Sequence, residues 1–359
     1  MNRIPLGISA RSQRAHRLVA PFSGRNGFVR LDRNEDPVGW PMELVDEFTS
    51  SITPESLAAY PDPALLTSRI GQWVGRNERE VLVTNGSTEG LRLVFETFVD
   101  ETKTTVRLDP SYSLYELYES VAGSHNLVTP YSPDLVPPIG DLVTIINTNQ
   151  PALVVVANPD QPTGVRITLD EIHQLAEASA TVGAVLAVDE AYHLFGAETA
   201  LPLISKYPNL VVIRTFSKAF GLAGLRLGYL VGDEQLIGKL RRLEPAVPPS
   251  SISLLGGVWV LDHMEAALGR VADAISGRQY LDHRLREAGS PAFPSFGNFL
   301  LIPLDSEAKA RAIVSGSRDR GFLIKGPLNV RGVGACVRVT IGPLALMEDY
   351  WRECGTLYS

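Results

Sequence analysis

Cysteine, methionine and tryptophan are scarce in this chain of 359 residues, which contains two, four and four of them. The two cysteines, Cys336 and Cys354, have no metal-binding spacing. We interpret them as spare thiols in a reducing cytoplasm, and we predict no metal site and a cytoplasmic location.

Long apolar runs and clusters of basic residues are also lacking. No apolar run approaches the roughly 20 residues that a helix needs to span a bilayer, so we expect no membrane partner. The opening segment MNRIPLGISARSQRAHR has charges but no apolar core, so a signal peptide is not expected. The net charge is −7 and no basic run occurs, which argues against a nucleic-acid partner.

Short apolar blocks alternate with helix-like stretches over residues 40–245. This alternation is typical of an α/β domain with a largely parallel sheet. The expected strands are VLVT (81–84), TVRLD (105–109), ALVVVAN (152–158), AVLAVDE (184–190), LVVIRT (210–215) and LGYLVG (227–232). The expected helices are 42–50, 64–75, 91–99, 114–122 and 169–181.

The stretch EPAVPPSS (244–251) breaks this rhythm and marks a boundary. Beyond it we expect a helical stretch over 252–288, the strand NFLLIPL (298–304), another helix and the strand ACVRVTIG (335–342). We therefore predict a large domain over 39–247 and a smaller α+β domain over 248–359. Residues 1–38 are expected to form an arm that lies near the small domain or crosses to a partner subunit.

Polar residues follow the expected strands. Ligands of open parallel sheets bind beyond the carboxyl ends of the strands, so these residues are candidates for one site. They are Asn85-Gly86-Ser87-Thr88, Pro110-Ser111-Tyr112, Asn158-Pro159-Asp160-Gln161, Asp189-Glu190-Ala191-Tyr192 and Ser217-Lys218. Any one of these five segments, taken alone, is compatible with an ordinary turn or helix cap. It is far less expected that all five converge on one site by chance.

Two of these segments suggest how a phosphorylated aromatic ligand could be held. NGSTEGL (85–91) opens a helix, and the free N–H groups and dipole of a helix N-terminus suit a phosphate; Ser87 and Thr88 are equally compatible with a simple cap. Tyr112 offers an aromatic face for a ring, or it is a core tyrosine.

The remaining segments supply an acid, an amine and a guanidinium. Asp189 ends an apolar strand and needs a cationic or protonated partner once it is buried. A desolvated Lys218 beside other cations would become a Schiff-base nucleophile. Arg226 follows eight residues later, about two helical turns, and could bind phosphate. A Lys Schiff base with an Asp partner to a ring nitrogen is typical of pyridoxal phosphate (PLP).

The sequence resembles the fold-type I PLP enzymes, and in particular their histidinol-phosphate aminotransferase-like branch. TFSKAFGLAGLRLGY (215–229) is similar to that family's lysine-attachment motif, and LDRNEDP (31–37), YPDP (60–63), NPDQPTG (158–164), DEAY (189–192) and RVTIG (338–342) follow in the family's order. The resemblance implies a mostly parallel seven-stranded sheet flanked by helices, a smaller α+β domain, and a homodimer.

The resemblance also implies a role for each site residue. Lys218 would bind the cofactor and shuttle the proton, and Asp189 would pair with the ring nitrogen. The other cofactor-binding residues would be Gly86, Ser87, Thr88, Tyr112, Asn158, Tyr192, Ser217, Arg226 and, from the neighbouring subunit, Tyr60. Arg338, Asn298, Lys325 and Asn34 would bind the substrate, although Asn298 is almost equally compatible with a hydrogen bond at the start of a strand.

One position differs from the resembled branch and leaves the substrate open. The family's stretch matching GFLIKG (321–326) ends in an arginine that takes the substrate phosphate, whereas Lys325 stands here. Lysine binds phosphate as a point charge without the planar fork of a guanidinium. Arg33 and Trp40 add charge and bulk near the expected substrate entrance.

The expected activity is transfer of an amino group between an amino acid or amino-phosphate and a 2-oxo acid. A PLP decarboxylase of a phosphorylated amino acid is the first alternative, because it would use the same lysine, aspartate and phosphate grip. A cofactor-binding sensor module without activity is the second; the intact lysine and the absence of a DNA-binding segment disfavour it.

Overall fold

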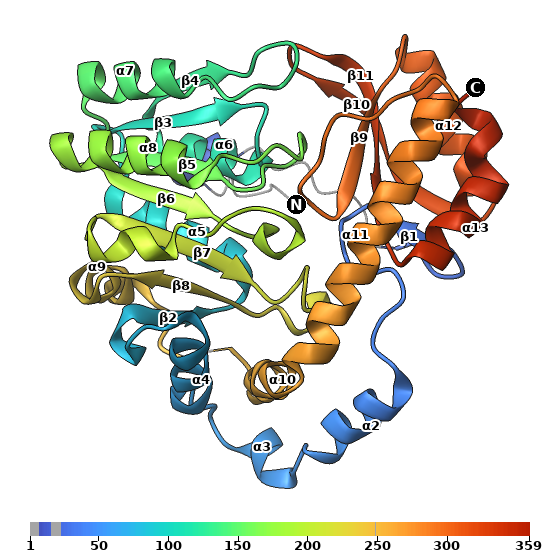
Figure 1. Cartoon of the computed structure of the whole chain (residues 1–359). Coiled ribbons are helices and arrows are strands. Elements are labelled where there is room, and N and C mark those ends of the chain that lie inside the picture. The colour runs from blue at the N-terminus through green and yellow to red at the C-terminus, as the bar shows by residue number, and fades with distance from the viewer. Residues whose placement is uncertain (1–6, 16–22, 248) are drawn as a thin grey trace, which may run out of the picture.

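The chain folds into two units that face each other across a cleft bridged by a long helix (Figure 1). The structure is a computed structural model that describes residues 7–15, 23–247 and 249–359. Parts of the predicted N-terminal arm, residues 1–6 and 16–22, lie outside the described residues.

The large unit is built on a seven-stranded sheet in the order β2-β8-β7-β6-β5-β3-β4. β8 runs antiparallel to β2 and β7, and the pairs from β7 to β4 are parallel. The strands are β2 (Val81–Thr84), β3 (Thr104–Asp109), β4 (His125–Pro130), β5 (Leu153–Ala157), β6 (Val185–Asp189), β7 (Leu210–Thr215) and β8 (Gly228–Gly232). This architecture confirms the predicted fold class.

Both faces of the large sheet are covered, which explains why its central strands are apolar throughout. Along β6, Leu186 and Val188 join one core cluster while Val185 and Ala187 join the other. The helices over the first face are α4 (Ala64–Val74), α7 (Ile139–Asn149) and α8 (Leu169–Val182). Those over the second are α5 (Gly86–Phe98), α6 (Ser113–Ala122) and α9 (Glu234–Leu240).

The small unit contains a four-stranded sheet in the order β1-β10-β11-β9. Its strands are β1 (Val29–Leu31), β9 (Phe299–Pro303), β10 (Phe322–Val330) and β11 (Gly334–Thr340), and its helices are α11 (Met264–Glu287), α12 (Glu307–Asp319) and α13 (Leu344–Cys354). β1 pairs in parallel with β10, so the N-terminal segment becomes part of the C-terminal sheet.

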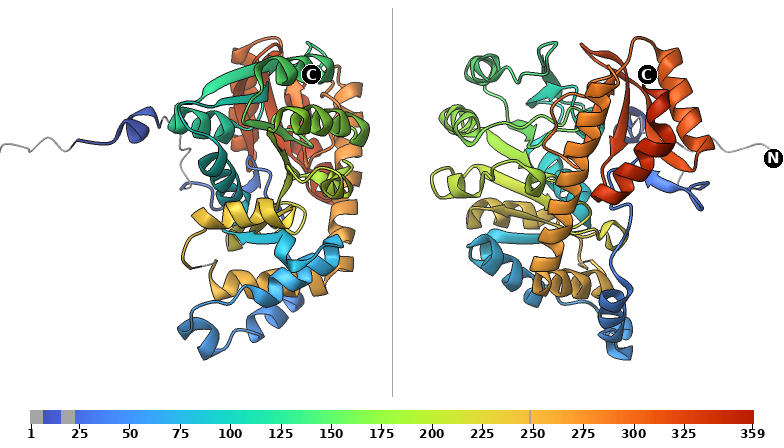
Figure 2. Two further views of the ribbon diagram at one scale, coloured as in Figure 1. Left: turned by 90° about the vertical axis from the view of Figure 1, so that its left-hand side faces the viewer. Right: turned by 45° about the vertical axis from the view of Figure 1, so that its right-hand side comes forward.

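The short helices that precede α4 extend these units. α2 (Met42–Ser50) and α3 (Pro54–Ala58) form an outlying excursion before α4 (Figure 1). α1 (Ala10–Arg14) lies against α6 of the large unit (Figure 2). There Arg14 Nε donates a hydrogen bond to the carbonyl oxygen of Ser120.

The expected helix over 252–288 is two helices, α10 (Ser251–Asp262) and α11, separated at His263. α10 packs against α4, so this first segment of the predicted small domain lies on the large unit. The division at residue 247 stays a prediction. Across the described ranges, no helix combines the length and apolar character needed to cross a membrane.

Candidate functional site

A cavity of about 180 Å³ lies at the carboxyl ends of the large sheet, facing the small unit. It brings together residues from strand ends and loops far apart in the sequence, as expected for an open parallel sheet. The predicted site residues that line it are Asn34, Ser87, Thr88, Tyr112, Asp189, Tyr192, Ser217, Lys218, Arg226 and Arg338.

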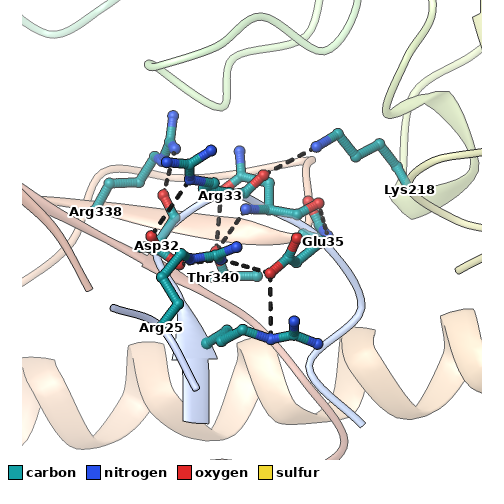
Figure 3. Close-up of polar contacts among 10 residues, drawn as sticks. Arg25, Asp32, Arg33, Glu35, Lys218, Arg338 and Thr340 are labelled. Carbon is teal, nitrogen blue, oxygen red and sulfur yellow. Dashed lines mark hydrogen bonds and ion pairs between the residues drawn. The ribbon is translucent and has the colours of Figure 1, made fainter. Parts of the chain in front are cut away.

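Lys218 follows β7 and extends its amine into this cavity. Its Nζ donates a hydrogen bond to the carbonyl oxygen of Arg33 at 3.0 Å (Figure 3). Burial, followed by the positive charge of Arg338, lowers the pKa of Lys218 to about 7; Arg226 acts in the same direction. A substantial fraction of the amine is therefore neutral near pH 7, which is the form that attacks a carbonyl carbon.

Asp189 is the last residue of β6 and lies buried at the inner end of the cavity. Its Oδ2 accepts a hydrogen bond from the hydroxyl of Tyr115 at 2.9 Å, and its Oδ1 accepts one from the backbone N–H of Ala191 at 3.2 Å. Burial raises the pKa of Asp189 to about 6, against the opposing effect of the Tyr115 hydrogen bond. A buried carboxylate of this kind calls for a cationic partner.

Tyr115 was not predicted as a site residue, although it lines the cavity. It follows the predicted aromatic residue Tyr112 by three positions, and the two rings meet edge to face with centroids 5.8 Å apart. A tyrosine in an amphipathic helix is usually a core residue. Its spacing of three residues from Tyr112 is therefore the only feature of the sequence that indicates a place for Tyr115 in the site.

A cradle for an anion is formed by the start of α5 and the loop after β7. Ser87 and Thr88 lie in the first turn of α5, and Arg226 Nη1 donates to Ser217 Oγ at 3.2 Å. A Cβ at Gly86 would lie 2.6 Å from Arg226 Nη2, so only glycine lets the guanidinium approach this turn. The N-terminal N–H groups of α5 and a guanidinium together suit a phosphate.

The predicted helical spacing between Lys218 and Arg226 is wrong. The intervening chain forms turns and a single 3₁₀ turn, Ala223–Leu225, and Arg226 itself has a left-handed backbone with φ of 52°. The two side chains reach one cavity because the loop folds back toward β8, with the Phe216 N–H bound to the Leu227 carbonyl.

A second group of cations lies where the small unit meets the cavity. Arg338 on β11 donates through Nη2 to the carbonyl oxygen of Asp32 at 3.2 Å, and its Nε is buried with no hydrogen-bond partner in the described chain. Lys325 on β10 stands opposite Arg338 in the strand register. Burial, then the charges of Arg338 and Arg33, lowers the pKa of Lys325. The arrangement suits an anionic ligand.

The segment of residues 32–35, which follows β1, holds these groups in place (Figure 3). The carbonyl of Asn34 accepts from Asn298 Nδ2 at 3.2 Å, and Asn34 Nδ2 donates to the hydroxyl of Tyr192 at 3.1 Å. Thr340 Oγ1 accepts from the Asn34 N–H at 2.9 Å. Arg25 pairs with the carboxylates of Asp32 and Glu35, which steadies the segment from outside.

Several predicted residues do not line the cavity. Asn158 is fully buried behind it, where its Nδ2 donates to the Glu198 carbonyl and its Oδ1 accepts from the Ile167 N–H. Gly86 and Lys325 adjoin the cavity through Arg226 and Arg338. Asn298 lines a smaller neighbouring cavity that Lys218 also touches. Tyr60 is 89% exposed and lies outside the residues that line the cavity.

The residues present fit PLP. The cradle at α5 and Arg226 offers donors for its phosphate, Tyr112 lies beside the cavity as an aromatic face, and Asp189 offers a carboxylate to the ring nitrogen. The amine of Lys218 lies within the same cavity. A phosphorylated, cationic aromatic aldehyde satisfies all four groups at once.

Comparison with known proteins gives a consistent picture. The model of the family described as aminotransferase class I and II matches residues 29–350. The chain is 30% identical over 319 residues to a histidinol-phosphate aminotransferase of Clostridium novyi, covering 88% of this chain and 87% of that protein. It is 32% identical over 327 residues to the histidinol-phosphate aminotransferase of Clostridium botulinum, covering 90% of each chain.

A solved structure shares the fold. The histidinol-phosphate aminotransferase of Sinorhizobium meliloti, determined in complex with pyridoxal-5'-phosphate, superposes with a TM-score of 0.88. The match covers 98% of this chain and 97% of that chain at 22% sequence identity.

Proposed function

Because this chain belongs to the aminotransferase class I and II family, whose members are PLP-dependent transaminases, we propose that it moves an amino group from an amino-phosphate or L-amino acid to a 2-oxo acid. The observation that carries the proposal is the placement of the Lys218 amine, with its pKa of about 7, in one cavity with Asp189, Arg226 and Arg338.

When bound, PLP supplies an aldehyde for the lysine amine and a ring that takes up the electrons left when the substrate Cα loses its proton. Asp189 would hold a proton on the ring nitrogen and so keep the ring electron-poor. Lys218 Nζ would accept the proton that leaves the substrate Cα and return a proton during the transfer. Ser217 and Arg226, with the first turn of α5, would bind the phosphate. Tyr112 would offer its aromatic face to the ring.

Tyr192 is proposed to donate to the ring hydroxyl oxygen. Its hydroxyl lines the cavity and is oriented by Asn34. The same role for Asn158 stays a prediction, because both ends of its amide are engaged with backbone groups.

An anionic substrate is supported by the charges around the cavity. The described residues that line it include four cations, Arg33, Arg226, Arg338 and Lys218, and one carboxylate, that of Asp189. Lys325 lies beside Arg338. The cofactor phosphate accounts for Arg226, and a substrate carboxylate accounts for Arg338 through bidentate binding. Lys325 is proposed to bind a further anionic group, and the named relatives act on a phosphorylated substrate. Arg33, which pairs with the carboxylate of Asp32, adds positive charge beside it.

Transamination is favoured over decarboxylation because the two relatives described above, which are 30% and 32% identical to this chain, are named aminotransferases. The site itself would serve either reaction, since both substrates carry a carboxylate for Arg338. The two outcomes are therefore separated in the experiment below.

A homodimer in the cytoplasm is part of the proposal. Tyr60 is exposed among other exposed apolar side chains, and it is proposed to reach the cofactor phosphate of the partner subunit. Met42, Leu57 and Leu65, which belong to the same segment of the chain from α2 to α4, are exposed as well.

The test is the visible absorption spectrum of PLP-loaded protein with amino acids and phosphorylated amines added one at a time. We expect the band to disappear with one class of donor and to return with a 2-oxo acid. Carbon dioxide release with a persistent band would establish the decarboxylase instead.

The Lys218→Ala variant should lose turnover by about 10³-fold or more while retaining PLP, because a covalent nucleophile and proton carrier is removed. Lys206→Ala, which removes an exposed lysine, is the matched control and should turn over normally. Full activity in Lys218→Ala would overturn the proposal.

A further inference from the structure

One buried side chain contacts both of the groups proposed to hold the cofactor ring. Tyr115 has no exposed surface and packs in the core between α6 and the large sheet. Its hydroxyl donates to Asp189 Oδ2 at 2.9 Å, and its ring meets the ring of Tyr112 edge to face at 5.8 Å and 89°. Its backbone N–H also donates to the Tyr112 carbonyl at 3.0 Å.

These contacts restrain two groups with different proposed roles, the carboxylate of Asp189 and the ring of Tyr112. Asp189 lies at the end of a strand, and a carboxylate there can rotate about its Cα–Cβ and Cβ–Cγ bonds. The Tyr115 hydroxyl fixes one oxygen and the Ala191 N–H fixes the other, so both rotations are restrained. Tyr112 immediately precedes α6, and the edge of the Tyr115 ring lies against its ring and supports it from the side.

Toward the ionised carboxylate of Asp189, the Tyr115 hydroxyl acts as the donor. Burial, followed by the charge of Asp189, raises the pKa of Tyr115 well above 10, so it stays protonated. A hydrogen bond donated to a carboxylate favours the ionised form, and that is the form that pairs with a protonated ring nitrogen.

We propose that Tyr115 is a positioning residue that holds Asp189 ionised and aimed at the ring nitrogen of PLP, and that supports Tyr112 against the ring face. The inference rests on the proposed function, since it concerns the same cofactor. Tyr115 thereby has a role that its position in the cavity lining does not by itself indicate.

Other charged groups also act on Asp189, and they set the background for a test by pH. Glu190 raises its pKa and Lys218 lowers it. The buried carboxyl of Asp160, which is bound by Ser111 and Tyr131, and the hydroxyl of Tyr192 also face it. Removing the Tyr115 hydroxyl leaves all of these in place, so a change can be assigned to one hydrogen bond.

The experiment measures the dissociation constant of PLP between pH 5 and 9 in the Lys218→Ala background, by the change in cofactor absorbance on binding. This background removes the titration of the lysine amine. Tyr115→Phe is compared with Tyr350→Phe, which removes an equally buried hydroxyl in the small unit. Free PLP titrates in the same way in both measurements. The ratio of the two PLP dissociation constants therefore reports only on the binding site.

We expect Tyr115→Phe to bind PLP about tenfold more weakly than the control near pH 6–7, because a charge-assisted hydrogen bond is lost. The pKa of Asp189 rises without the hydroxyl, so the ratio should shrink toward pH 9, where the carboxylate is ionised in both proteins. Tyr115→Leu should show the same pH-dependent ratio plus a pH-independent loss, because its ring no longer supports Tyr112.

A ratio near one, or a ratio equal at all pH values, would overturn the inference, since a merely structural tyrosine would weaken binding uniformly. Because Phe and Leu both lack the hydroxyl, either variant alone gives this answer if the other does not fold. Failure of the parent protein to bind PLP at all would instead overturn the proposed function.

Discussion

The reactivity of Lys218 depends on which charges surround it. Burial is the largest cause of its lowered pKa, and burial penalises the ammonium form of any lysine. Arg338 and Arg226 lower the pKa further, whereas Glu35 and Asp189 raise it. The amine is therefore charged below about pH 7 and neutral above it.

This balance predicts how PLP capture by the cofactor-free protein varies with pH. The capture rate should rise through about pH 7 in the wild type, because only the neutral amine attacks the aldehyde. Arg338→Gln removes a cation, raises the pKa of Lys218 and moves the midpoint to higher pH. Glu35→Gln removes an anion and moves it to lower pH. Stopped-flow absorbance measures both, and equal midpoints in the two variants would contradict the assignment.

At the scale of the element, the start of α5 and the strand β8 approach so closely that one glycine is required. A Cβ on Gly228 would lie 2.5 Å from the backbone nitrogen of Ser87 and 2.8 Å from the carbonyl oxygen of Arg214. Backbone atoms cannot move aside as a flexible side chain would. The strand and the helix N-terminus would have to separate, which would open the proposed phosphate cradle.

Gly228→Ala should therefore lower the free energy of unfolding by roughly 1–3 kcal/mol or more and weaken PLP binding. Gly224→Ala is the control, because nothing lies within 4 Å of its added Cβ. Urea unfolding with and without PLP gives both quantities. Equal stability and equal PLP affinity in the two variants would show that the close approach has no energetic importance.

Sequence patterns predicted the elements whose local signals agree with their burial. The central strands are apolar on both faces, so β5, β6 and β7 were expected within one residue of their observed bounds. Edge and irregular strands lacked this signal: β4 reads HNLVTP, and β10 contains Gly326-Pro327 in its middle. Proline cannot donate to a sheet ladder, which hid β10 from a search for apolar runs.

The sequence predicted cavity-lining residues where they follow a strand, and it missed Tyr115, which lies within a helix. Lys218 and Asp189 stand directly after apolar blocks, and the cavity brings them together. Tyr115 supports the site from within α6, where its sequence context is that of a core residue. Asn158 follows a strand as well, yet its amide turns to the backbone of neighbouring loops, which only the tertiary structure reveals.

At the scale of the whole molecule, the exposed apolar side chains of the α2–α4 region require an explanation. Met42, Leu57, Tyr60 and Leu65 are each more than half exposed. Several large exposed apolar side chains within one segment of a chain are consistent with a protein interface. Burial against a second copy of the chain is consistent with the proposed homodimer.

Sedimentation should accordingly give a mass about twice the 39.0 kDa of one chain. Leu57→Glu should shift the protein toward the monomer and weaken PLP binding, because Tyr60 would no longer reach the partner's site. Leu268→Glu places the same charge on an exposed leucine of α11 and should leave the mass unchanged. A wild-type monomer that binds PLP tightly would refute the shared site.

The parallel pairing of β1 with β10 has a consequence for the order in which the protein is made. Val29 leaves the ribosome nearly 300 residues before its partner Phe322. Until then the segment that holds Lys218, Arg338 and Asn298 has no sheet to join, whereas the large sheet, complete by Gly232, can already form. A nascent chain would thus possess the lysine and its aspartate long before it could grip a substrate. The chain would become able to bind a substrate only after its last strands had been synthesised.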